Sequence, residues 1–235
     1  MASPTAERER IGGIENLRRG FLLLFGASAI DLFLALFSLS AYIRGARATA
    51  VPRSLAVWGL AAGLLALTLF ILGILSWVFR IIGWGKLCRG VGKRFYCYVR
   101  IILVLLPILG TIVVAATIAL LIVKMLSLGP TMSVWELEKA KGLVIYFALG
   151  LALMTASFII EGVALLDFSY VLESRLLRNG GALYIVANVL SVLNSVTGML
   201  KFAPIVKSVF NILSSILAVV SALMLYWALR AGGES

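Results

Sequence analysis

The chain has 235 residues, of which 62% are hydrophobic and only 13% are charged. This apolar share exceeds that of ordinary soluble domains and excludes a protein that buries its hydrophobic residues in one water-soluble core. The length suits a single domain of about six membrane-spanning helices, because each crossing of a ~30 Å hydrocarbon layer takes about 20 residues.

The sequence contains no histidine and only two cysteines, Cys88 and Cys97. The lack of histidine excludes His-ligated zinc, bis-His haem and a histidine general base. The two cysteines lie nine positions apart, which fits neither a CxxC redox pair nor zinc ligands. We therefore expect two small apolar side chains, no disulfide, no metal and no cofactor. No nucleophile with a base and no paired carboxylates are seen, so we expect no enzymatic activity.

Residues 1–19 are polar and charged and lack the pattern of a cleavable signal, so we expect this N-terminal segment to remain in the mature protein. A single membrane domain is predicted over residues 20–230, followed by a short tail, 231–235. We predict an all-α, polytopic bundle whose spans are bracketed by charged or helix-breaking residues. The six apolar runs cover residues 20–43, 55–79, 101–123, 142–166, 181–200 and 205–229.

The fourth helix is expected to extend past its span to Arg178 and to stop at Asn179, Gly180 and Gly181, which are typical of a helix C-terminus. The last two spans are joined by only a few residues, 201–204, and are expected to form an antiparallel hairpin. The orientation in the membrane is predicted from the Lys and Arg residues outside the spans. The two tails and the loops on their side of the membrane contain thirteen of these residues, and the loops on the opposite side contain eight. The positive-inside rule thus predicts a multi-pass cell-membrane protein with both termini in the cytoplasm.

The connection over residues 80–100 is rich in cations and has no acidic residue. Its apolar members recur every three or four positions, which predicts an amphipathic helix lying on the cytoplasmic membrane surface. Anionic lipid headgroups are the expected partner. The candidate lipid contacts are Arg80, Lys86, Arg89, Lys93, Arg94 and Arg100.

The glycines of this connection do not follow a nucleotide-binding pattern, because no Ser or Thr comes after the lysines and the glycine spacing differs from GxGxxG. The formal net charge of +11 is accounted for mostly by the positive loops at the membrane. We therefore expect no nucleic-acid partner.

Small and polar residues inside the spans suggest helix contacts. Gly59 and Gly63 form a GxxxG pattern, which favours close helix packing within the bundle or between two copies. Spans five and six carry polar stripes that either hydrogen-bond across the hairpin or line a hydrated path. The stripes include Asn188, Asn194 and Asn211.

Two carboxylates lie within apolar runs, Asp31 and Glu161. Asp31 is near the middle of span one, where an ionised group is costly and usually has a functional or structural partner. We expect it to be protonated, to face water, or to bond a neutral group of spans five or six such as Asn188 or Asn211. Glu161 lies nearer the cytoplasmic end and within reach of Arg80 or Arg100, which makes it the weaker candidate for a functional site.

Three segments of the chain are distinctive: Gly13-Ile14-Glu15-Asn16-Leu17-Arg18-Arg19-Gly20, the glycine-rich aromatic stretch 83–98, and the hairpin opening Gly180-Gly181-Ala182. Together they resemble a family of small archaeal polytopic membrane proteins of unknown function. The resemblance covers most of the chain and implies an archaeal membrane protein without implying an activity.

Two classes of function remain open. The first is a non-enzymatic membrane protein, such as an accessory or scaffold subunit of a membrane complex, which pairs with another membrane protein or with itself. The alternative is a small transporter or channel that uses Asp31 and the polar faces of spans five and six.

Overall fold

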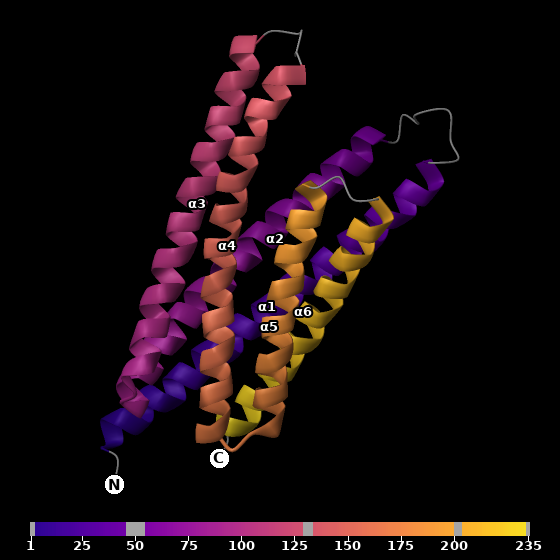
Figure 1. Cartoon of the computed structure of the whole chain (residues 1–235). Helices are drawn as coiled ribbons and strands as arrows, with labels where there is room; N and C mark the ends of the chain where they lie inside the picture. The colour runs from indigo at the N-terminus through magenta and orange to yellow at the C-terminus, as the bar shows by residue number, and fades with distance from the viewer. Residues whose placement is uncertain (1–2, 46–54, 129–133, 200–203, 234–235) are drawn as a thin grey trace.

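The computed structural model describes residues 3–45, 55–128, 134–199 and 204–233, and they form six helices with no strand among them (Figure 1). Each of the six includes a stretch long and apolar enough to cross a membrane, so the predicted all-α polytopic bundle is confirmed. In chain order the helices are α1 (Pro4–Gly45), α2 (Leu55–Val91), α3 (Arg94–Leu128), α4 (Val134–Val171), α5 (Arg175–Met199) and α6 (Pro204–Gly233).

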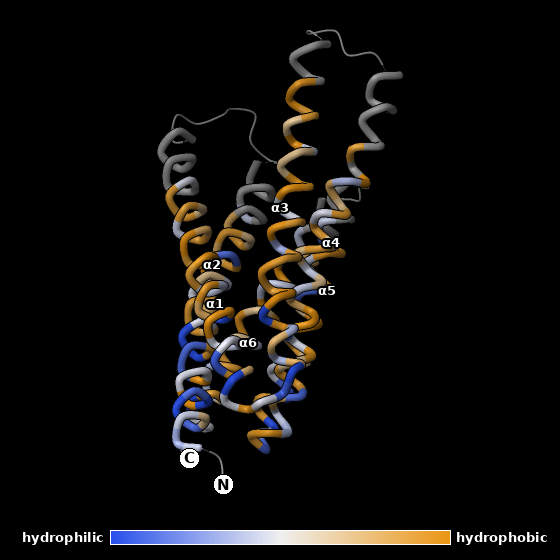
Figure 2. Tube along the Cα trace, turned by 90° about the vertical axis from the view of Figure 1, so that its left-hand side faces the viewer, coloured by the Kyte–Doolittle hydropathy of each residue, from blue (hydrophilic) through white to orange (hydrophobic). Residues whose placement is uncertain are grey.

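The helices form three antiparallel hairpins, α1–α2, α3–α4 and α5–α6. The start of α1, the end of α6 and the two short turns that join the hairpins lie at one end of the bundle, here called the turn end (Figure 1). Figure 2 shows hydrophilic residues concentrated toward the turn end and hydrophobic ones along most of the remaining helix length. This separation of polar end and apolar body is what a membrane-spanning bundle requires.

The helices are longer than the apolar runs because they continue through polar residues at the turn end. Most of the segment predicted as a separate polar N-terminus, residues 1–19, is helical from Pro4 and belongs to α1. Ile14 and Leu17 of that segment are buried in the core. Hydropathy marks where a helix leaves the lipid, but the backbone hydrogen bonds of a helix continue wherever packing supports them.

The predicted interfacial helix over residues 80–100 requires correction. α2 continues to Val91, and after a turn at Gly92 and Lys93 α3 begins at Arg94. Gly92 has φ of 71°, a conformation that glycine adopts without a Cβ clash. The aromatic residues Trp84 and Tyr96 are fully buried, so these side chains pack into the protein and not into the lipid surface, whereas Phe95 and Tyr98 are exposed.

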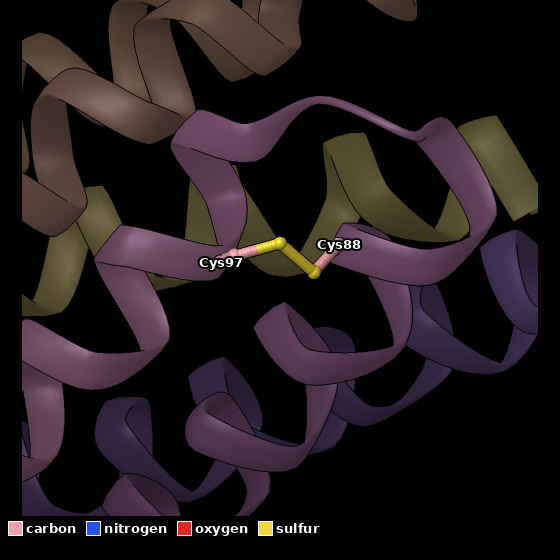
Figure 3. Close-up of a disulfide and its surroundings, with 2 residues drawn as sticks. All are labelled: Cys88 and Cys97. Carbon is pink, nitrogen blue, oxygen red and sulfur yellow. A yellow bond between two sulfur atoms is a disulfide. The ribbon is translucent and has the colours of Figure 1, made fainter.

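The prediction that Cys88 and Cys97 form no disulfide is wrong. They are bonded to each other, with a Cα–Cα distance of 5.0 Å (Figure 3). The turn at Gly92 and Lys93 reverses the chain midway between the two cysteines, so the last turns of α2 and the first turn of α3 lie side by side. A nine-residue separation is therefore bridged by antiparallel helices, a geometry that linear spacing motifs do not describe.

The expected stop of helix four at Asn179 to Gly181 also requires correction. α4 ends at Val171, and the chain turns where Glu173 takes φ of 50°. The Ser174 hydroxyl then accepts a hydrogen bond from the Leu177 amide at 3.2 Å, which caps the start of α5. Gly180 and Gly181 lie inside α5, where both are buried against neighbouring helices.

The hydrophobic core lies in the half of the bundle near the turn end. Its fully buried members come from all six helices and include Leu17, Trp84, Leu103, Phe168 and Leu225. Away from the turn end the α3–α4 hairpin and the α1–α2 hairpin diverge (Figure 1). The bundle is thus closed by packing at the turn end and looser toward the other end.

Gly63 of the GxxxG pattern makes no close contact with the described residues. A Cβ built on Gly63 meets no atom within 4 Å, and the surroundings of Gly59 lie outside the described residues. Close packing is instead seen at Gly110 of α3 and Gly150 of α4, where each Cβ would come within 3 Å of the other helix's backbone. Whether the pattern mediates a helix contact, within the bundle or between two copies, therefore stays a prediction.

Candidate functional site: an internal ion pair and a polar cavity

The most buried charges of the described structure are Arg80 of α2 and Glu161 of α4. Arg80 is 2% exposed and Glu161 is 0% exposed, and Nη1 of Arg80 donates to Oε2 of Glu161. Tyr184 of α5 joins them, because its hydroxyl accepts from Nη1 at 2.6 Å and donates to Oε2 at 3.0 Å. Trp84 Nε1 donates to the other carboxylate oxygen at 3.1 Å. These four residues are here called the ion-pair cluster.

Residues of α1 and Phe158 of α4 complete the surroundings of the cluster. The Arg80 guanidinium lies 5.7 Å from the ring centre of Phe21 and 5.3 Å from that of Phe158, distances typical of cation–π contacts. A Cβ on Gly20 would lie 2.6 Å from Cγ of Arg80, so only glycine leaves room for this side chain. Ser76 also donates to the Gly20 carbonyl at 2.8 Å, which fixes α1 against α2.

A cavity of about 150 Å³ lies next to the ion-pair cluster. It has room for several water molecules, each of which takes about 30 Å³ in the liquid. Its walls come from every helix except α3 and combine charged, polar and small apolar side chains. The lining residues are Leu24, Asp31, Arg80, Phe158, Tyr184, Ala187, Asn188, Ser191, Ser214, Ser215 and Ala218. We call this space the polar cavity.

Asp31, the carboxylate predicted in mid-span, lines the polar cavity and is partly buried. Its Oδ2 accepts a hydrogen bond of 2.6 Å from the hydroxyl of Ser215 in α6. Asp31 forms no ion pair with any described Lys or Arg. The structure therefore gives Asp31 a neutral partner in span six, as well as contact with a polar space.

The remaining sequence candidates lie in three places. Asn188 lines the polar cavity, and its amide nitrogen donates to the Tyr184 carbonyl at 2.8 Å. Asn194 and Asn211 bond each other across the α5–α6 hairpin at 3.1 Å. Glu161 belongs to the ion-pair cluster and is the more buried of the two intramembrane carboxylates, although the sequence marks it as the weaker candidate.

The six basic residues predicted to contact lipid headgroups have different environments. Arg80 is inside the bundle, so its inclusion among the lipid contacts is wrong. Arg89 pairs with Glu9 at 3.3 Å, and Lys93 pairs with Asp167 at 3.0 Å. Lys86 is half-buried, whereas Arg94 and Arg100 are exposed at the start of α3.

Sequence reasoning did not identify Tyr184, Trp84 or Ser215 as members of these sites. A signal for Tyr184 exists in its position four residues before Asn188, which places both on one face of a helix. Ser215 similarly follows Asn211 by four positions. Trp84 carries no such signal, because a tryptophan in a glycine-rich aromatic segment is as typical of the membrane interface as of a buried site.

The arrangement suits binding of a small polar species. A space bounded by a carboxylate, hydroxyls and a guanidinium offers hydrogen-bond partners inside an otherwise apolar bundle. Two members of the ion-pair cluster, Arg80 and Tyr184, form part of the cavity wall.

Comparisons of the chain with family models, with curated proteins and with solved structures found no match. This result is consistent with the resemblance to an uncharacterised family, and nothing in it indicates an archaeal origin.

Proposed function

We propose that the protein is a non-enzymatic membrane protein that binds a small polar solute or ion in the polar cavity and carries it across the bilayer. The observation that supports this proposal is the common location of Asp31, Asn188 and Ser215, which come from three helices and line one cavity. Ionisable residues inside membrane spans commonly mark solute or proton pathways. Arg80 and Tyr184 of the ion-pair cluster line the cavity, so a solute that crosses toward the turn end passes the cluster.

Transport is tested in proteoliposomes loaded with a pH-sensitive dye or with buffers of different cation composition. The full-length protein is expected to support a proton or cation flux above that of empty liposomes, and Asp31→Asn is expected to abolish it. Glu15→Gln removes an exposed carboxylate paired with Arg19 and serves as the matched control. Flux that is unchanged in Asp31→Asn would contradict a role of this carboxylate in transport.

A second candidate function, an accessory subunit of a membrane complex, is favoured by a different feature. An apolar groove of about 510 Å³ lies between α2, α3 and α4, lined by residues such as Phe70, Trp77 and Ile108. A helix of another membrane protein could pack there. Affinity purification from native membrane discriminates the two, since a stoichiometric partner supports the subunit role and a lone chain with flux supports transport.

A further inference from the structure

Three polar atoms of residues that line the polar cavity have no partner within the described structure. The hydrogen bonds of Arg80 run from Nε and Nη1, so Nη2 donates to none of the described residues. Asp31 is bonded through Oδ2 alone, and Asn188 is bonded through its amide nitrogen alone. Although the Arg80 side chain is only 3% exposed, Nη2 is not among the fully buried unpaired atoms of the described residues, so water or a ligand can reach it.

The charges around the cavity do not balance. Arg80 is compensated by Glu161, with which it forms an ion pair. Asp31 has no cationic partner among the described side chains. When Asp31 is ionised, the cavity therefore carries one uncompensated negative charge, which favours a monovalent cation as its occupant.

The two charged groups stand at opposite ends of the cavity. Arg80 packs against Gly20, and Asp31 lies eleven residues further along α1, which is about 16 Å at ~1.5 Å per residue. Helical side chains tilt toward the N-terminus of their own helix. Because α1 and α2 are antiparallel, Arg80 and Asp31 tilt toward each other, and the space between them is shorter than the backbone separation.

We propose that the ligand of the polar cavity is a small organic monocation with an ammonium group at one end and a neutral hydrogen-bond acceptor, such as a hydroxyl, at the other. This inference rests on the proposed function of the cavity as a solute site. The ammonium binds Asp31, and the hydroxyl accepts from Nη2 of Arg80. The methylene groups between them contact Leu24, Phe158 and Ala218. A cavity of about 150 Å³ suits a ligand of a few non-hydrogen atoms.

The proposal is tested by binding of a series of molecules of similar size to the full-length protein in detergent at constant ionic strength. Ethanolamine has both groups, ethylamine lacks the acceptor, glycolate and ethylene glycol lack the ammonium, and glycine carries a carboxylate in place of the hydroxyl. Ethanolamine is expected to bind tightest, with ethylamine several-fold weaker. Glycine is expected to bind weakly because Glu161 already neutralises Arg80. Equal or tighter binding of glycine, glycolate or ethylene glycol would overturn the proposal.

Variants of the chain make the test specific for the cavity. Asp31→Asn is expected to weaken ethanolamine binding about tenfold or more, whereas Asp31→Glu and the surface control Glu15→Gln are expected to retain it. Ala218→Leu fills the cavity and is expected to abolish binding while the melting temperature is kept. Ethanolamine binding that survives Asp31→Asn and Ala218→Leu would contradict the site.

These experiments can refute the proposed transport and the proposed ligand class independently of each other. Amine binding that depends on Asp31, without flux of any cation in proteoliposomes, would refute transport and leave the ligand assignment intact. Flux that depends on Asp31, with no preference for amines in the binding series, would refute the ligand assignment and leave transport intact.

Discussion

Arg80 and Glu161 are separated by 81 positions in the chain, yet they form an ion pair whose side chains are only 3% and 0% exposed. The pair connects α2 with α4, and through Tyr184 it also reaches α5. Charges are costly to bury, so such a pair persists only when its members also have hydrogen-bond partners, which Trp84 and Tyr184 provide.

We predict that removing one member of the pair destabilises the bundle strongly. Glu161→Leu leaves the Arg80 guanidinium buried without its counter-ion, which should lower the free energy of unfolding by about 3–5 kcal/mol. The double variant Arg80→Met with Glu161→Leu removes both charges and should restore much of that loss. Thermal unfolding in detergent measures both variants.

The exposed pair of Glu15 and Arg19 provides the control for this measurement. Breaking it with Glu15→Gln should cost less than about 1 kcal/mol, because solvent screens the two charges. A Glu161→Leu protein as stable as the Glu15→Gln protein would show that the buried pair does not hold the bundle together.

More of the fold than of the candidate site could be predicted from the sequence. Apolar runs of about 20 residues are a local property, and all six runs became helices that can span a membrane. An ion pair between Glu161 and an arginine of a neighbouring span was predictable, because Arg80 and Arg100 are the cations close to its level in the membrane. The choice of Arg80 over Arg100 depends on Gly20, which makes room for the Arg80 side chain, and such tertiary complementarity is not visible in hydropathy.

The errors near the turn between α2 and α3 have one physical cause. A periodic apolar face with cations opposite predicts an amphipathic helix, but it does not say whether the apolar face meets lipid or protein. Here Trp84 and Tyr96 pack in the core, so the segment continues two spans instead of lying on the membrane. The same reversal of the chain brings Cys88 next to Cys97.

Substitution of Asp31 is predicted to affect function more than stability. The hydroxyl of its partner Ser215 also lies 2.9 Å from the Asn211 carbonyl, so in Asp31→Leu its single proton can be donated to that carbonyl instead. We therefore expect a loss of less than about 1 kcal/mol in unfolding free energy. Thermal unfolding of Asp31→Leu beside the flux assay measures both effects. A large loss of stability with normal flux of the folded fraction would identify Asp31 as a structural residue.

Binding of anionic lipid is predicted to depend on Arg94 and Arg100. Both are exposed at the start of α3, whereas Arg89 and Lys93 are engaged with carboxylates. Each exposed cation close to the membrane surface should contribute about 1 kcal/mol of attraction to anionic headgroups, and added salt should weaken it. The measurement is the thermal stability of the protein in lipid nanodiscs with neutral or anionic lipid.

In that experiment the wild type should gain stability from anionic lipid, and Arg94→Gln with Arg100→Gln should lose most of the gain. Arg89→Gln is the matched control, because this cation already pairs with Glu9. An equal gain in the wild type and the double variant would exclude these two arginines as the lipid contacts.

The disulfide is predicted to stabilise the turn between α2 and α3. Cross-linking Cys88 to Cys97 closes a short loop and should contribute on the order of 2–3 kcal/mol through the entropy of the unfolded chain. Cys88→Ser with Cys97→Ser should therefore unfold at lower temperature than the oxidised wild type and at a similar temperature to the reduced wild type. Identical melting of all three forms would show that the packing of Trp84 and Tyr96 alone fixes the turn.

The same disulfide makes the orientation of the protein testable in two independent ways. The positive-inside rule predicts a cytoplasmic turn end, since thirteen Lys and Arg residues lie on that side and eight on the other. Disulfides, however, persist mainly in oxidising compartments, and a cytoplasmic disulfide is expected to be reduced in cells other than those of hyperthermophiles.

We predict that fluorescent-protein fusions at both termini are fluorescent and that phosphatase fusions are inactive. Thiol alkylation in intact cells should then find Cys88 and Cys97 largely reduced in a mesophilic host. Active phosphatase at either terminus, together with an oxidised cysteine pair, would place the turn end outside the cytoplasm and show that the charge bias does not set the orientation.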